Sequence, residues 1–91
     1  MDQFIISLIK EGALTSKLHG LRAIKREGTK LFYTRGLWFY WFDMKTQKYE
    51  AAVGDHKSGE YDSLKLAIEE AKCLFDRECL NSVFDQYGGN L

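Results

Sequence analysis

Three side chains of this sequence could take part in acid–base or nucleophilic chemistry: His19, His56 and Cys73. A histidine can carry a proton near neutral pH, and a cysteine thiolate can act as a nucleophile when a histidine lies beside it. Neither histidine stands within a metal-ligand spacing of the other or of a cysteine. We expect both histidines, which adjoin Gly20 and Lys57, to be solvated, and Cys73 to pack beside the apolar stripe of a helix.

The sequence shows no other catalytic pattern. Glu69, Glu70 and Asp76 form an acidic helix surface, and the carboxylate pair of a glycosidase needs a cleft that so small a domain seldom has. No glycine-rich run ends in Gly-Lys-Ser/Thr, as a phosphate-binding loop requires. We therefore expect no catalytic residue, no cofactor and no metal ion, and we interpret the chain as a binding module rather than an enzyme.

Length and composition are those of a small folded protein. The 91 residues make a single domain, residues 1–91, and 45% apolar with 29% charged residues is typical of globular chains. The N-terminal apolar stretch is too short for a secretory signal, and no apolar run approaches a membrane span. Cys73 and Cys79 point to different sides of a helix, which predicts two reduced thiols. We expect a cytoplasmic protein with no membrane association.

The first segment, residues 1–12, predicts a helix. Its apolar residues repeat at helical spacing, and Gly12 follows the last turn as a left-handed stop. The residues of this stripe are Phe4, Ile5, Leu8 and Ile9. Ile6 lies off the stripe, so we expect this helix to be buried on more than one side.

The next segment, residues 13–28, fits two structures. Leu14, Leu18, Leu21 and Ile24 could line a second helix capped by Thr15, although Gly20 would weaken it. Alternatively, residues 21–26 form a strand that turns at residues 27–28 and pairs with residues 30–34. The extended segments that follow favour the strand.

Strands dominate residues 13–61. Residues 37–42, Leu-Trp-Phe-Tyr-Trp-Phe, are favoured in strands on both pleat faces, which is typical of a central strand covered on both sides. A polar turn at residues 43–46 leads to residues 48–53, whose alternation predicts a half-exposed strand. Residues 54–59 read as a polar loop, and Glu60 and Tyr61 as part of a short further strand.

The C-terminal segment, residues 62–80, predicts an amphipathic helix capped by Asp62 or Ser63. Residues 81–91 read as a tail in which Val83, Phe84 and Tyr87 pack back. The predicted fold class is α+β: an N-terminal helix, an antiparallel meander of three or four strands, and a C-terminal helix packed on one sheet face.

The run GLWFYWFD, KYEAAVGD, GEYDS and LKLAIEEAKCLFDRE, between Tyr33 and Cys79, resembles in its layout two kinds of DNA-binding domain. These are the plant ethylene-response type and the arm-binding domains of phage integrases, in which three strands precede a helix. The stretch GEYDSLKLAIEEAKCLFD is also similar to small proteins encoded by phages and prophages. The order of elements is shared with double-stranded-RNA-binding domains as well, but residues 64–68 lack their Lys-Lys-x-Ala-Lys opening.

The resemblance implies contacts from arginine and tryptophan on the exposed sheet face. Here the matching strands offer Trp38, Tyr40, Trp41 and Lys48 but few arginines, and Glu50 shares a face with Lys48. Aromatic residues of this kind are enriched at protein interfaces. We therefore expect a protein-binding module, an inhibitor or accessory factor of a phage or mobile element, with a host protein or a second copy as partner.

The alternative hypothesis is nucleic-acid binding. Residues 10–48 carry nine Lys or Arg against three acids, whereas residues 49–91 carry four against nine, so the zero net charge hides an asymmetry. Basic residues attract phosphate and aromatic rings such as Phe32 and Tyr33 can stack on bases. The basic residues that would bind are Lys17, Arg22, Lys25, Arg26, Lys30 and Arg35.

Overall fold

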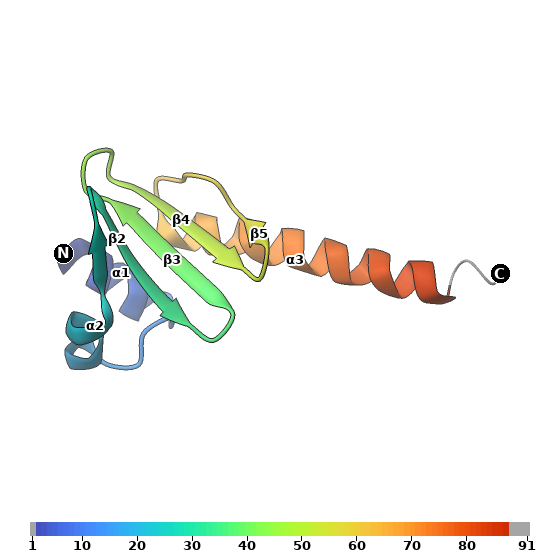
Figure 1. The fold of residues 1–91 in the computed structure, drawn as a ribbon, viewed down its shortest axis with the longest axis horizontal. Helices are drawn as coiled ribbons and strands as arrows, with labels where there is room; N and C mark the ends of the chain where they lie inside the picture. The colour runs from blue at the N-terminus through green and yellow to red at the C-terminus, as the bar shows by residue number, and fades with distance from the viewer. Residues whose placement is uncertain (1, 88–91) are drawn as a thin grey trace.

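A computed structural model describes the backbone of residues 2–87 and the side chains of residues 3–78 (Figure 1). Two helices and a sheet form two layers, and a third, short helix lies at one end. The elements follow in the order α1 (Asp2–Lys10), α2 (Lys17–Ala23), β1 (Lys25–Glu27), β2 (Lys30–Arg35), β3 (Trp38–Asp43), β4 (Lys48–Val53), β5 (His56–Lys57) and α3 (Leu64–Tyr87). The predicted α+β class is confirmed.

The sheet is an antiparallel meander of five strands in the order β1-β2-β3-β4-β5. Strands β2 and β3 are joined by the two residues Gly36-Leu37, and Gly36 has a φ of 61°. A glycine at the first position of a two-residue hairpin turn supplies this positive φ without steric cost. Gly28 opens the turn between β1 and β2 in the same way, with a φ of 62°.

The cross-strand register divides the sheet into two faces. Tyr33 pairs with Tyr40, which pairs with Ala51, and all three are buried. The neighbouring set, Phe32 with Trp41 and Trp41 with Glu50, points to the opposite side because successive side chains of a strand alternate.

The hydrophobic core lies between one sheet face and the helices α1 and α3. The ring of Phe4 on α1 stacks on Phe42 of β3, with ring centroids 6.0 Å apart. The largest fully buried side chains are Phe4, Ile5, Leu8, Leu31 and Leu64. Ile6 is 59% exposed, so the prediction that α1 is buried on more than one side was wrong. The helix packs against the sheet with one stripe, as a helix on the surface of a two-layer fold does.

Residues 13–28 contain both of the predicted structures in shortened form. Helix α2 is capped by Ser16, whose hydroxyl accepts a hydrogen bond from the His19 amide at 3.1 Å, rather than by Thr15. Its predicted stripe is wrong, because Leu18 and Leu21 are exposed. Strand β1 follows directly after α2 and pairs with β2, as the favoured alternative predicted. It is shorter than predicted, because it begins at Lys25 and not at residue 21.

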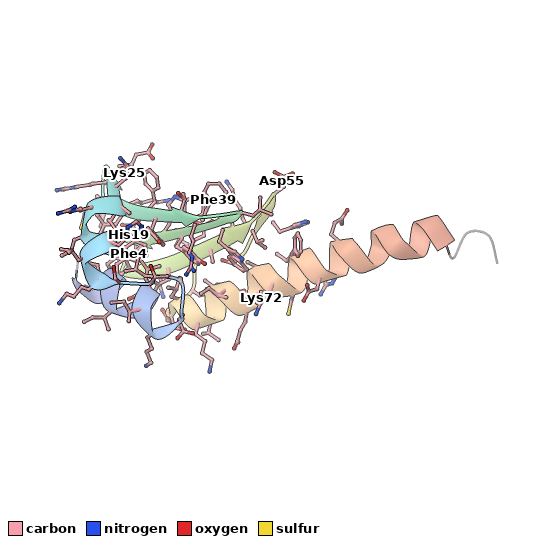
Figure 2. The ribbon with its side chains drawn as sticks, turned by 90° about the horizontal axis from the view of Figure 1, so that it is seen from below. Phe4, His19, Lys25, Phe39, Asp55 and Lys72 are labelled. Carbon is pink, nitrogen blue, oxygen red and sulfur yellow. The ribbon has the colours of Figure 1, made fainter. Side chains whose placement is uncertain are left out.

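The central strand β3 is covered on one face, not on both as predicted. Among the described residues, α1, α2 and α3 all contribute to the same side of the sheet (Figure 2). Antiparallel hairpins do not require a helix on each face, so one side can remain in solvent. The aromatic residues on the second side of β3 are therefore surface residues.

Helix α3 begins as predicted but ends later than predicted. The Ser63 hydroxyl accepts a hydrogen bond from the Leu66 amide at 3.2 Å, which confirms Ser63 as the cap. The helix continues to Tyr87 instead of ending near residue 80, because no glycine or proline interrupts the chain before Gly88. It runs well past the end of the sheet (Figure 1). The proposed packing of Val83, Phe84 and Tyr87, and residues 88–91, lie outside the described side chains.

The strand expected at Glu60 and Tyr61 is reduced to a single bridge. Tyr61 pairs with Tyr49 through hydrogen bonds of 2.7 and 2.8 Å. The fifth strand instead occupies His56 and Lys57, inside the segment predicted to be a polar loop. A turn at Gly54 reverses the chain and brings His56 and Lys57 alongside β4. Edge strands are often polar, which is why the composition of this segment suggested a loop.

Candidate functional site

The three candidates for acid–base or nucleophilic chemistry, His19, His56 and Cys73, lie on different elements of the structure. His19 is exposed on α2, whereas His56 is half-buried on β5, and its ring lies in a T-shaped arrangement with that of Phe75, at a centroid distance of 5.9 Å. Cys73 is exposed, so its predicted packing role was wrong. Within residues 3–78, no group of three or more His, Cys, Asp or Glu side chains could hold a metal ion.

The four predicted partner-binding residues are divided between the two sides of the sheet. Trp38 and Tyr40 point to the helix-covered face, where their rings stack with centroids 5.8 Å apart. Trp41 points to the uncovered face. Lys48 also points there, and its ammonium pairs with the Asp62 carboxylate. The predicted set does not form one surface.

The uncovered side of the sheet, which we call the open face, is built from three cross-strand rows. The first row is Lys25-Phe32-Trp41-Glu50, the second is Glu27-Lys30-Asp43-Lys48, and the third is Thr34-Phe39-Ala52-Lys57. Figure 2 shows Lys25 and Phe39 on the side of the sheet away from α1 and α3. The open face therefore carries three aromatic rings surrounded by charged side chains.

The aromatic rings of the open face are accessible. Phe39 is 37% exposed, and Phe32 and Trp41 are half-buried. Phe39 and Trp41 stack with centroids 5.9 Å apart and ring planes 16° apart. Beside them lies a shallow hollow of about 320 Å³ lined by Glu27, Lys30, Trp41, Glu50 and Lys57. A partner placed here would contact ring faces and charges of both signs.

The open face carries charges of both signs, and most of them form no salt bridge among the described side chains. Among the described side chains, the pair of Lys48 with Asp62 is the one salt bridge. The Lys45 amide donates a hydrogen bond of 2.9 Å to Asp43 and holds the pKa of that carboxyl below its ordinary value. Thr29, Thr46 and the charge of Lys30 act in the same direction, while burial opposes them. Asp43 is thus an anion at neutral pH.

A second hollow, which we call the end groove, lies on the helix side of the sheet. It encloses about 680 Å³ between the loop after α1, the β2–β3 turn and α3. Arg35 donates hydrogen bonds of 3.3 Å to the carbonyl oxygens of Gly12 and Ala13. Burial raises the pKa of the neighbouring Tyr40 hydroxyl, and the charge of Arg35 partly offsets this. The groove is lined by Gly12, Ala13, Arg35, Gly36, Leu37, Trp38, Tyr40, Val53 and Phe75.

Most of the basic residues predicted to bind nucleic acid gather at one edge of the sheet. Arg22 on α2, Lys25 and Arg26 on β1, and Lys30 at the start of β2 are all exposed. Arg35 stands at the other end of β2, where it ties the loop after α1 to the sheet. Four of the six predicted residues therefore lie at or near the β1 edge of the sheet, whereas Lys17 stands at the start of α2 and Arg35 at the far end of β2.

Sequence reasoning missed Phe39, Glu27 and Lys57 as members of the open face. Their alternation along the strands was readable, but the side that the helices cover was not. The useful signal was the pair of glycine turns at Gly28 and Gly36, which fixes the pairing of three strands and hence the rows.

The search for similar proteins returned nothing that names the site: no protein-family model, curated protein or solved structure matches the chain. Within the described part of the chain, no helix has the length and apolar character to cross a bilayer.

Proposed function

We propose that this protein is a non-enzymatic binding module that docks another protein on its open face. The observation that carries the proposal is the exposure of Phe39 and Trp41 on the central strand, on a side that no element of the described chain covers. Large aromatic side chains supply much of the energy of protein interfaces because they bury a wide area at low entropic cost. A soluble sheet face rarely presents them without a partner.

The charges favour a protein over a nucleic acid as that partner. Glu50 is the direct cross-strand neighbour of Trp41, and Lys30 lies between Glu27 and Asp43. A phosphate backbone that followed these rings would meet carboxylates on both sides, and like charges repel at this spacing. A protein surface with charges of both signs can complement the same pattern.

The resemblance to small phage-encoded proteins extends this proposal. On that reading the module acts in the cytoplasm as an inhibitor or accessory factor. The surface of α3 that carries Glu69, Glu70 and Asp76 would suit a basic partner. The phage origin, the compartment and the host partner are all parts of the proposal.

A photo-crosslinking experiment tests the docking surface. A photoreactive phenylalanine analogue replaces Phe39 in one variant and Leu18 in a control, since Leu18 is a 67% exposed apolar residue on α2, away from the open face. We expect a protein adduct from position 39 and not from position 18. Equal adducts from both positions, or no protein adduct from position 39, would contradict the proposal.

The basic edge supports nucleic-acid binding as a second candidate function. Arg22, Lys25, Arg26 and Lys30 are all exposed, and Lys25 is the cross-strand neighbour of Phe32 on β2. A titration of duplex and single-stranded DNA against salt tests it, because phosphate contacts release counterions and weaken as salt rises. The triple change Arg22→Ser, Lys25→Ser and Arg26→Ser should abolish such binding. Absence of binding at low salt by the unchanged protein rules this candidate out.

A further inference from the structure

We infer that the partner of the open face is a second copy of this chain, packed face to face about a two-fold axis that runs parallel to the strands between β2 and β3. This inference rests on the proposed function, because it needs the open face to be a protein-docking surface. The observation behind it is the order of charges along the cross-strand rows.

The symmetry operation has a simple effect on the rows. A two-fold axis that lies between the two sheets, parallel to the strands, exchanges β2 with β3 and β1 with β4. It leaves each residue at its own level along the axis, so each row of one copy faces the same row of the other copy in reverse order. Such an interface is self-complementary only if the two residues of a row that lie at equal distances on either side of the axis attract each other.

The first row meets this condition. It reads Lys25, Phe32, Trp41 and Glu50 from β1 to β4. In reverse order, Lys25 faces Glu50 of the second copy, and Phe32 faces Trp41 of the second copy. The two aromatic pairs lie next to the axis and the two ion pairs lie outside them, which is the apolar centre and polar rim of known interfaces.

The second row meets it too, whereas the third row is matched only at its β2 and β3 positions. In the second row, Glu27 faces Lys48 of the second copy and Lys30 faces Asp43, so every charge meets its opposite. Lys48 already pairs with Asp62 within its own chain, which makes the Lys30–Asp43 contact the stronger of the two. In the third row, the ring of Phe39 faces the methyl group of Thr34. All six charged residues of the first two rows are matched.

The position of the axis matters. If the axis ran between β3 and β4 instead, Trp41 would face Glu50 of the second copy, and Phe32 would face the short β5. That arrangement places a carboxylate against the indole face, whose quadrupole repels anions. The axis between β2 and β3 is therefore the one that the charges select. The right-handed twist of each sheet turns the facing strands by about 30°, which keeps the central rings in contact and spreads the rim.

The expected dimer is weak. Four strands at about 4.8 Å and three rows at about 7 Å cover roughly 400 Å² in projection on each copy, which is at the small end of specific interfaces. Association should therefore appear in the micromolar to millimolar range, with a dimer that dissociates on dilution.

Charge reversal tests this geometry. Lys25→Glu and Glu50→Lys each place two like-charged pairs across the two-fold axis, so each single variant should weaken dimerisation at least tenfold. The double variant Lys25→Glu with Glu50→Lys recreates both pairs with the signs exchanged and should restore it. Lys17→Glu, an exposed change on α2 outside the open face, is the matched control. Analytical ultracentrifugation over a concentration series measures association, and circular dichroism checks that each variant folds.

The outcomes separate this inference from the proposed function. Restored association in the double variant, with both single variants impaired, supports the two-fold geometry. A folded protein that stays monomeric at every concentration, or a double variant no better than the singles, overturns it. If the chain is monomeric but position 39 crosslinks to a different protein, the inference is overturned while the proposed function stands. If position 39 yields no adduct at all, both fail.

Discussion

Ser7 on α1 donates a hydrogen bond of 3.0 Å to the hydroxyl oxygen of Tyr49 near the start of β4. Tyr49 is only 3% exposed, and its ring packs against Phe42 with centroids 4.8 Å apart. The contact joins residues 42 positions apart in the sequence. It therefore fixes the N-terminal helix in register on the covered face of the sheet.

Removal of this hydrogen bond should lower stability by a modest and non-additive amount. Ser7→Ala and Tyr49→Phe should each reduce the free energy of unfolding by about 1 kcal/mol, because a hydrogen bond within a protein contributes about that much. The double variant should lose about as much as one single variant, since the same bond is removed. Urea unfolding of the four proteins measures these free energies. If the double variant lost as much free energy of unfolding as the two single variants together, the contact would contribute nothing to stability.

Gly20 should resist replacement although it lies in a helix. An added Cβ would overlap the side chain of Leu14, which is buried against α2. Gly20→Ala should therefore reduce the free energy of unfolding by about 1 kcal/mol, because overpacking exceeds the gain in helix propensity. In a Leu14→Ala background the same change should become stabilising. Thermal unfolding of both pairs checks this sign reversal, and a stabilising effect in the unchanged background would refute it.

The cap of α3 makes a third prediction. Ser63→Ala removes the acceptor of the Leu66 amide and should reduce the free energy of unfolding by about 1 kcal/mol. Ser63→Asp supplies another acceptor and should retain most of the stability, because aspartate is an equally good N-cap. Chemical unfolding followed by far-UV circular dichroism compares the two variants. Equal losses would indicate that the hydroxyl does not cap the helix.

Asp43 should contribute to the acid sensitivity of the protein. Its pKa is lowered in the folded state, chiefly by the Lys45 amide, so the anion stabilises the fold at neutral pH. This contribution is present above the unfolded pKa and is lost as the pH falls through the lower folded value. Asp43→Asn should therefore be less stable than the unchanged protein near neutrality, with a gap that narrows below about pH 4.

A pH series of urea unfolding curves tests this prediction. Asp55→Asn is the matched control, because Asp55 is an exposed carboxylate in the turn between β4 and β5. The control should keep the pH dependence of the unchanged protein. If the difference in free energy of unfolding between Asp43→Asn and the unchanged protein did not vary with pH, the Asp43 anion would not be the cause.

Local signals in the sequence were sufficient for the elements that have strong caps or turns. The end of α1 near Gly12, the polar turn after Asp43 and the cap at Ser63 are all local, and the structure has each of them. Of the predicted α1 stripe, Phe4, Ile5 and Leu8 are buried, but Ile9 is 42% exposed, so its place in the stripe was wrong. Residues 13–28 were harder because a short helix and a short strand follow one another. Each is too short for periodicity to separate them.

The candidate site was the part that sequence reasoning could least resolve. Trp38, Tyr40 and Trp41 look alike in a run of six apolar residues, yet the first two lie on the covered side and Trp41 on the open face. A shift of one residue in register would exchange them. Only the long-range packing of α1 and α3 decides which set is exposed, and no local pattern reports that packing.

The order of the strands also has a kinetic consequence. Because each strand of the sheet pairs with the next one along the chain, every hairpin closes a loop of only two to four residues. Such closures cost little entropy and are fast, and the absence of proline removes the slow isomerisation that delays many refolding reactions. The sheet can thus grow strand by strand as the polypeptide leaves the ribosome. The docking of α3, the last element to be synthesised, then completes the core.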